Sequence, residues 1–186
     1  MLNEKQLHSS SEVSNFINKI ADSILKSFPS GTYSLVGIHH QGVPLAERIC
    51  DRIEKLTNKR PECGQLDISM YRDDIGNRDR LPLIKETIIP FDVNNQNIIL
   101  VDDVLSTGRT IRAALDALTD YGRPGLIRLA VLVDRGEPEF PIRADFVGTQ
   151  ISLPQDYKIL VNFAEDDSKT GIFAAQWNTP KSEIIK

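Results

Sequence analysis

The residue types best suited to chemistry stand together between residues 102 and 110. Two adjacent carboxylates, Asp102 and Asp103, end an apolar run and are followed by a loop that carries Ser106, Thr107 and Gly108. Carboxylates accept hydrogen bonds from sugar hydroxyls, whereas hydroxyl groups and the backbone N–H groups at a helix start suit a phosphate. The pattern therefore predicts a site for a sugar phosphate.

The elements on either side of this loop should place it at the edge of a sheet. Residues 97–101 are apolar, rich in β-branched side chains and too few for a buried helix, which predicts a parallel strand covered on both faces. Residues 111–118 have helical spacing, so a helix should begin near Thr110 with its unpaired N–H groups facing the loop. Ligands of such sheets bind beyond the carboxyl ends of the strands.

A plain strand–turn–helix joint, with Thr110 as the helix cap, is the simplest explanation of Thr110 alone. It does not explain Asp102 and Asp103, because buried charges without a partner are costly. The loop also differs from the nucleoside-triphosphate loop, which needs two glycines and a lysine, and from the dinucleotide fingerprint with its three spaced glycines. Arg109 adds a positive charge whose direction the sequence does not give.

The rest of the chain alternates between predicted strands and helices. Apolar residues at helical spacing predict helices at 13–28 and 43–56, with Ser10 or Ser11 as the first cap. Strands are predicted at 33–38, 66–70, 88–91, 97–101, 126–133, 146–147 and 158–161. This alternation predicts one α/β domain over residues 1–186, with a mainly parallel twisted sheet flanked by helices. A mobile loop is expected at 71–85 and a disordered tail at 179–186.

Composition narrows the class of protein. No apolar stretch approaches the ~18 residues that span a bilayer, and the start of the chain lacks the features of a secretory signal. Cys50 and Cys63 are isolated from each other in sequence and are expected to be reduced, so a cytoplasmic protein without a membrane contact is expected. The formal net charge of −4 argues against a generally basic surface for nucleic acid.

A local basic stripe is nevertheless present. Four cations recur at helical spacing: Arg48, Arg52, Lys55 and Lys59. They form either a solvated helix face that offsets the neighbouring acids Glu47, Asp51 and Glu54, or a local patch for nucleic acid. The sequence leaves both interpretations open.

The string from Ile98 to Thr110 resembles the ribose-phosphate signature of type I phosphoribosyltransferases, enzymes that use 5-phosphoribosyl 1-diphosphate (PRPP). Segments at 67–74, 121–124, 131–136 and 140–148 resemble one branch of that family, the pyrimidine operon regulators that are also uracil phosphoribosyltransferases. The similarity spans about residues 35–148. It implies the type I phosphoribosyltransferase fold, a parallel sheet with a small hood.

The resemblance also implies a role for each site residue. Asp102 and Asp103 would accept hydrogen bonds from the ribose 2- and 3-hydroxyls. The 5-phosphate would lie in the loop of Ser106, Thr107, Gly108, Arg109 and Thr110, and Val104 and Leu105 would also belong to the substrate site. The pyrophosphate would lie against the loop of His40, Gln41 and Gly42. Arg135 would lie close to the acceptor base, with 142–148 forming part of the hood over it.

The implied reaction transfers the phosphoribosyl group of PRPP to a pyrimidine, with uracil giving UMP and pyrophosphate released. The anomeric carbon should pass through an oxocarbenium-like state that does not tolerate water. Residues 71–85 are expected to close over it, with Arg72 and Lys85 as catalytic cations and Arg78 and Arg80 as further cations. Mg²⁺ is expected to enter with PRPP and to be held by substrate oxygens and water, without a metal site of protein groups alone.

The chain departs from the family pattern within the site. Family members usually carry a Lys-Thr-Arg-Gly type loop where this chain has His39, His40, Gln41 and Gly42, so two cations are missing beside the pyrophosphate. The histidines replace part of that charge only when protonated, and their ordinary pKa is ~6.5. Ser106 stands where enzymes for 6-oxopurines usually carry Asp and where the pyrimidine regulators often carry an aromatic residue, which argues against hypoxanthine or guanine.

Three other functions stay open on the sequence alone. The chain could be mainly a regulator that binds an mRNA leader and senses nucleotides, with weak or no transferase activity. It could use a purine or orotate as acceptor, with Arg143 as the cation for the orotate carboxylate. It could also be a non-catalytic subunit that stabilises an oligomer. The family resembled forms dimers and higher assemblies, so a homodimer or larger homo-oligomer is expected.

Overall fold

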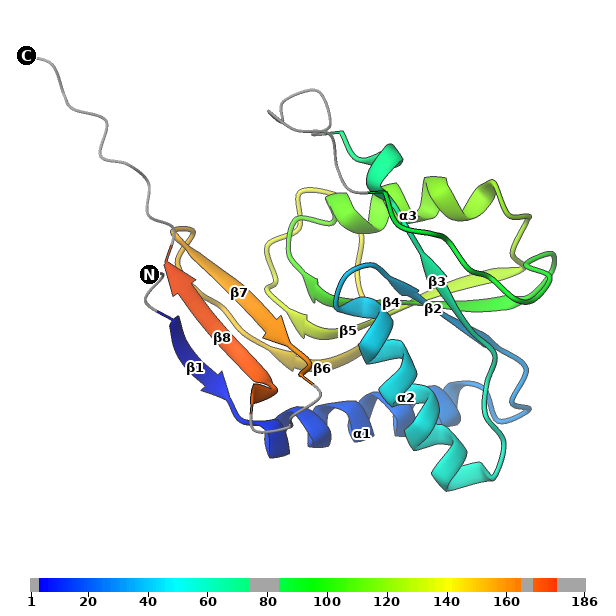
Figure 1. Cartoon of the computed structure of the whole chain (residues 1–186), viewed down its shortest axis with the longest axis horizontal. Helices are drawn as coiled ribbons and strands as arrows, with labels where there is room; N and C mark the ends of the chain where they lie inside the picture. Colours follow the sequence, from blue (N-terminus) through cyan, green and yellow to red (C-terminus); the bar gives the residue numbers. More distant parts are fainter. Residues whose placement is uncertain (1–3, 74–83, 165–168, 177–186) are drawn as a thin grey trace, which may run out of the picture.

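The structure, a computed structural model, describes residues 4–73, 84–164 and 169–176. Its centre is a five-stranded parallel sheet with the strand order β3-β2-β4-β5-β6 (Figure 1). The strands are β2 (Ser34–Ile38), β3 (Cys63–Leu66), β4 (Asn97–Leu105), β5 (Leu126–Asp134) and β6 (Phe146–Gln150). The predicted α/β fold with a mainly parallel sheet is confirmed.

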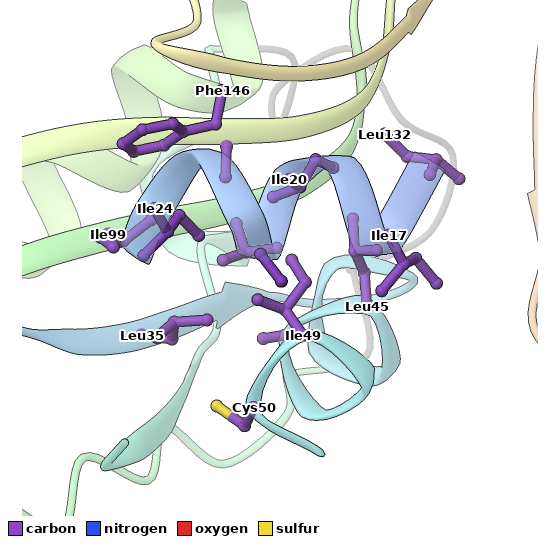
Figure 2. Packing of buried hydrophobic residues seen from close by; sticks show 14 of the residues in the cluster. Ile17, Ile20, Ile24, Leu35, Leu45, Ile49, Cys50, Ile99, Leu132 and Phe146 are labelled. Carbon is purple, nitrogen blue, oxygen red and sulfur yellow. The ribbon is translucent and has the colours of Figure 1, made fainter. Parts of the chain in front are cut away.

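Helices cover both faces of this sheet. They are α1 (Ser10–Ser27), α2 (Gly42–Thr57) and α3 (Arg109–Thr119). α1 and α2 cover one face and α3 covers the other, because each helix has a single apolar side (Figure 1). Ile20 of α1 and Leu45 and Ile49 of α2 meet the sheet in one cluster (Figure 2). Along β4, Ile99 packs into that cluster and Leu100 packs with α3 on the other face.

A separate antiparallel sheet forms the small hood that the resemblance implies. Its strands are β1 (Glu4–His8), β8 (Gly171–Gln176) and β7 (Tyr157–Asn162), in that order. The sequence predicts no strand at 4–8, because its side chains are exposed or half-buried and show no apolar alternation. The strand expected at 158–161 pairs within the hood and not at the edge of the main sheet. Residues 146–148, which the resemblance places in the hood, belong to β6.

β3 ends earlier than the predicted strand at 66–70, and Ser69–Tyr71 form a short 3₁₀ helix. Asp67 accounts for this end. Its side chain accepts hydrogen bonds from the backbone N–H of Ser69 at 3.0 Å and from the hydroxyl of Ser69 at 2.6 Å. Such local hydrogen bonds compete with the ladder of a sheet and turn the chain away from it.

Two other boundaries differ from the prediction. α1 is capped by Ser9 and not by Ser10 or Ser11, because Glu12 accepts a hydrogen bond from the Ser9 N–H at 2.9 Å and completes a capping box. The predicted strand at 88–91 is a single bridge and not a strand.

In the part of the chain that the structure describes, no helix is long and apolar enough to cross a membrane. The predicted disordered tail at 179–186 lies outside the described residues. So do residues 74–83 of the predicted mobile loop, and with them Arg78 and Arg80.

Candidate functional site

The two carboxylates lie on β4 itself, because the strand continues to Leu105 and not only to the predicted residue 101. Asp102 is buried, with 5% of its surface exposed, and Asp103 is partly exposed. The Asp103 N–H donates a hydrogen bond to Asp102 Oδ1 at 3.0 Å. The pair therefore lies at the carboxyl end of a central strand, where sheets of this kind bind their ligands.

Burial decides the electrostatics of this pair. Burial, and then the neighbouring charge of Asp103, raise the pKa of Asp102 well above its ordinary value, while the charge of Arg72 acts in the opposite direction. Burial also raises the pKa of Asp103, against hydrogen bonds from Asp102 and the Val104 N–H and against the charge of His40. The structure thus brings Arg72 and His40 close enough to act on the carboxylates.

Asp102→Asn is expected to stabilise the free protein at pH 7 by about 0.5–2 kcal/mol, the usual gain from relieving a strained functional group. The folded-state pKa lies above the unfolded value, so the ionised carboxylate costs stability as pH rises through the interval between them. The asparagine Oδ1 can still accept the Asp103 N–H. Urea unfolding at pH 7 and pH 4 checks this, and the gap between the proteins should narrow at pH 4. An Asp102→Asn protein less stable than the parent at pH 7 would contradict the claim that the ionised Asp102 carboxylate lowers the stability of the free protein.

The loop after β4 is held in shape from outside. The Thr107 carbonyl accepts hydrogen bonds from the backbone N–H groups of Glu139 at 2.9 Å and Phe140 at 3.1 Å. Gly108 has φ +91°, and a Cβ there would lie 3.3 Å from the Cβ of Phe140, so both the turn and the close approach favour glycine. α3 begins at Arg109 with Gly108 as its cap, one residue before the predicted start at Thr110. The first N–H groups of α3 are therefore free of intrahelical partners at the loop.

Arg109 turns toward acidic residues outside the loop. Its Nη1 lies 2.6 Å from Asp73, and its Nε and Nη2 lie 3.0 and 2.7 Å from one oxygen of Glu139. Its guanidinium also lies over the ring of Phe140, 5.4 Å from the centroid. The sequence alone did not give the direction of the Arg109 side chain. In the structure its guanidinium pairs with the carboxylates of Asp73 and Glu139.

The His39-His40-Gln41 loop lies directly against β4, just before the carboxylates. A Cβ on Gly42 would lie only 2.4 Å from the Val101 carbonyl oxygen, so only glycine permits this approach. α2 starts at Gly42, and its positive dipole end faces the loop. Gln41 points toward the hood instead, because its Oε1 accepts a hydrogen bond from the Phe163 N–H at 3.3 Å.

Asp67 joins the two ends of the segment expected to close over the site. Besides its bonds from Ser69, it accepts a hydrogen bond from the Lys85 N–H at 2.7 Å. Burial raises the pKa of Asp67, but these hydrogen bonds from Ser69 and Lys85 outweigh burial and lower it overall. Lys85 is thus anchored through its backbone, and Arg72 follows the 3₁₀ helix on the other side of the same anchor.

Comparison with known proteins agrees with this geometry. Residues 3–168 match the family model described as phosphoribosyl transferase domain. The chain belongs to that family. It is 47% identical to the bifunctional protein PyrR of Roseiflexus sp. (strain RS-1) over 92% of this chain and 95% of that protein. It is 54% identical to the bifunctional protein PyrR of Ligilactobacillus salivarius (strain UCC118) over 74% of this chain and 79% of the relative.

Solved structures show the same fold at low sequence identity. A hypoxanthine-guanine phosphoribosyltransferase from Bacillus anthracis aligns with a TM-score of 0.68 at 16% identity, covering 95% of this chain and 99% of that chain. A hypoxanthine phosphoribosyl transferase of Trypanosoma cruzi aligns with a TM-score of 0.70 at 15% identity, covering 95% and 92%. The predicted type I phosphoribosyltransferase fold and the predicted branch, which contains the PyrR proteins, are both confirmed.

In this phosphoribosyltransferase, Arg135 ties the hood to the main sheet. Its Nη1 donates to the Tyr157 carbonyl at 2.7 Å and its Nη2 to the Leu153 carbonyl at 3.2 Å, while Glu137 lies 3.1 Å from Nη2. The Arg135 side chain is 8% exposed. The predicted contact of Arg135 with an acceptor base stays a prediction. The contacts that the structure shows join Arg135 to other parts of the protein.

A cavity of about 400 Å³ opens beside Ser106, next to the ends of β5 and β6. Its lining includes Ser106, Asp134, Ile142, Arg143, Val147 and Gln150. The cavity thus joins the phosphate loop to a space with an amide, a carboxylate and a guanidinium at its wall. Among the described residues, no group of three or more His, Cys, Asp or Glu side chains could hold a metal ion.

Sequence reasoning missed four residues around the phosphoribosyltransferase site: Asp67, Asp73, Glu139 and Phe140. Asp73 and Glu139 are 36 and 30 residues away from Arg109 in sequence, so no local spacing reveals their contact. Asp67 was within a predicted strand, and its place two residues before Ser69 was the one available indication of a turn.

Proposed function

We propose that this chain transfers the phosphoribosyl group of PRPP to uracil, giving UMP and pyrophosphate, with Mg²⁺ entering bound to PRPP. We also propose that it acts in the cytoplasm as a homodimer or larger homo-oligomer. The observation that carries the reaction is the buried pair Asp102 and Asp103 beside a phosphate-type loop at the end of β4. Membership of the family and of the branch that contains the PyrR proteins supports it.

The residues divide the PRPP molecule among them. Asp102 and Asp103 accept the ribose 2- and 3-hydroxyls, and their negative charge favours the positive charge that develops on the ribose ring. The N–H groups and hydroxyls of the 106–110 loop hold the 5-phosphate. Backbone at Gly42 and the start of α2 holds the pyrophosphate, with Arg72 adding positive charge. Mg²⁺ bound with PRPP would be held mainly by substrate oxygens and water and would supply positive charge there, and the partly exposed carboxylate of Asp103 fits its preference for few protein ligands.

The cavity beside Ser106 is our candidate for the acceptor base. It lies next to the phosphate loop, so a base there would face the ribose held by Asp102 and Asp103. Gln150 and Asp134 offer hydrogen-bond partners suited to the carbonyl and N–H groups of uracil. Arg143 in the same wall keeps orotate as the rival acceptor.

One assay tests the acceptor. Uracil, orotate, hypoxanthine and guanine are each offered with PRPP and Mg²⁺, and pyrophosphate release is measured. We expect uracil to give the highest kcat/KM. A preference for orotate would make orotate the acceptor, with Arg143 as the cation for its carboxylate. Absence of pyrophosphate release with every base would support a non-catalytic subunit instead.

A second function, binding of an mRNA leader, is favoured by the basic stripe on α2. Arg48, Arg52 and Lys55 line a hollow of about 270 Å³ between α1 and α2. Arg48 also lies over Phe163, 5.2 Å from the ring centroid. The Nε of Arg52 is buried without a hydrogen-bond partner among the described residues.

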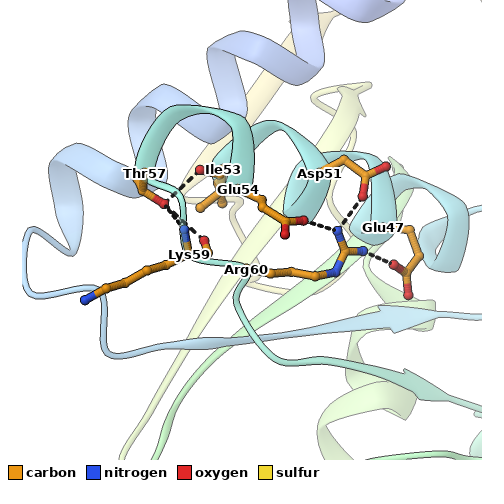
Figure 3. A network of polar contacts seen from close by, with 7 residues as sticks. All are labelled: Glu47, Asp51, Ile53, Glu54, Thr57, Lys59 and Arg60. Carbon is orange, nitrogen blue, oxygen red and sulfur yellow. Dashed lines mark hydrogen bonds and ion pairs between the residues drawn. The ribbon is translucent and has the colours of Figure 1, made fainter.

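The neighbouring acids have a cation of their own in Arg60. Arg60 contacts Asp51 and lies 2.5 Å from Glu47 and 3.1 Å from Glu54, so one guanidinium engages all three carboxylates (Figure 3). Offsetting these acids is therefore not the only role open to the stripe. We propose that Arg52 and Lys55 at this hollow bind phosphate groups of RNA.

Arg52→Ala is expected to weaken binding of a pyrimidine-operon leader RNA and to reduce the salt dependence. Loss of one phosphate contact should lower the slope of log K against log[salt] by about 0.7 for single-stranded RNA. Binding measured between 50 and 200 mM salt checks this. Lys59→Ala is the matched control, since Lys59 follows the end of α2 and does not line the hollow. Equal effects of the two substitutions would contradict a site in the hollow.

A further inference from the structure

The phosphate loop is fastened to a second loop, and the fastening is built from both backbone and side chains. The backbone N–H groups of Glu139 and Phe140 both donate to the Thr107 carbonyl. Phe140 and Ile142 also pack on Gly108, where an added Cβ would lie 3.3 Å from the Phe140 Cβ and 3.5 Å from the Ile142 Cδ1. The shape of the 5-phosphate loop therefore depends on residues 139–142.

Arg109 adds a side-chain clamp at the same place. It binds Glu139 through Nε and Nη2 and binds Asp73 through Nη1. Asp73 directly follows Arg72, whose charge acts on Asp102. One guanidinium thus connects the phosphate loop, the 139–142 segment and the segment that carries Arg72.

Stability alone does not account for this clamp. The side chains of Arg109, Glu139 and Asp73 are 50%, 51% and 40% exposed, and ion pairs at that exposure contribute little to folding. A guanidinium beside a phosphate site would otherwise be expected to turn toward the phosphate. Here two carboxylates hold it outward, which leaves the loop N–H groups and hydroxyls to bind the phosphate.

We propose that Glu139 is a positioning residue for the donor, acting through Arg109. It keeps the phosphate loop in its binding shape by holding the Arg109 guanidinium outward, away from the loop N–H groups. This inference rests on the proposed function, because it assumes that the loop binds the 5-phosphate of PRPP. Glu139 itself does not touch the substrate.

Glu139→Gln tests the proposal without removing the backbone hydrogen bond to Thr107. We expect KM for PRPP to rise about threefold to fivefold, the range that exposed ion pairs support, with kcat changed less than twofold. Affinity for ribose 5-phosphate should fall by the same factor, while affinity for pyrophosphate stays unchanged. Glu54→Gln is the matched control, because it breaks an exposed ion pair with Arg60 near the end of α2, away from the phosphate loop.

The double variant Arg109→Gln, Glu139→Gln separates positioning from general damage. Each single change should raise KM, and the double variant should raise it no further than the larger single effect, because the two residues act as one unit. Additive effects, or equal losses for ribose 5-phosphate and pyrophosphate, would overturn the proposal. Failure of the unaltered protein to bind ribose 5-phosphate would instead overturn the proposed function.

Discussion

Replacing Asp103 with asparagine is expected to lower kcat/KM for PRPP by about 10- to 100-fold. The asparagine keeps the shape of the side chain but removes its charge and replaces one acceptor oxygen by a donor. A hydrogen bond to a charged group contributes roughly 1.5–3 kcal/mol, which corresponds to that loss. Asp103 is the more exposed member of the pair, so it is the better placed to reach a ribose hydroxyl.

The measurement is steady-state kinetics with PRPP as the varied substrate. Unfolding in urea serves as the control, and it should show that the Asp103→Asn protein remains folded. Kinetics equal to those of the parent protein would contradict the ribose role of Asp103. If the Asp103→Asn protein proves unfolded, the kinetics are measured instead on Asp103→Glu. That variant keeps the charge and should retain more activity than the asparagine variant.

Gly42→Ala is expected to lower kcat/KM by about 100-fold, because a displacement near 1 Å at a reacting centre can cost that much. Its Cβ would lie 2.4 Å from the Val101 carbonyl oxygen, and that oxygen belongs to a central strand that cannot easily yield. The pyrophosphate loop would therefore move away from Asp102, whose Cα lies 3.2 Å from the same Cβ. Overpacking should also cost roughly 1–3 kcal/mol of stability.

Gly171→Ala provides the matched control for this substitution. Its Cβ would lie 2.9 Å from the His8 carbonyl oxygen, which is again a backbone overlap, but within the hood. The control should lose stability without a comparable loss of kcat/KM for PRPP. If Gly42→Ala left kcat/KM within about threefold of the parent, the close approach of this loop to β4 would have no role in donor binding.

The parts of the fold that sequence predicts are those with a strong period. The apolar spacing of α1 and the unbroken apolar run of β4 both predict burial, and both contribute side chains to the same core cluster. β1 carries no such period, because its side chains are only half-buried or exposed, and its partner β8 lies more than 160 residues away along the chain. Pairing over that distance leaves no local trace.

The candidate site shows the same division. The carboxylate pair and the glycine of the phosphate loop are close in sequence, and the structure places them where the sequence predicts, at the end of β4 and the start of α3. The directions of Arg109 and Gln41 are decided by Glu139 and by Phe163, which are distant in sequence. The contacts of Arg60 with the acids beside the basic stripe are likewise visible only in the structure.

The central claim is that Asp102, Asp103 and the 106–110 loop hold the ribose 5-phosphate part of PRPP. A crystal structure of the protein with PRPP and Mg²⁺ tests it most directly. The account predicts ribose hydroxyls within hydrogen-bond distance of both carboxylates and the 5-phosphate against the loop N–H groups. An empty crevice at the end of β4, with PRPP bound elsewhere on the protein, would contradict it.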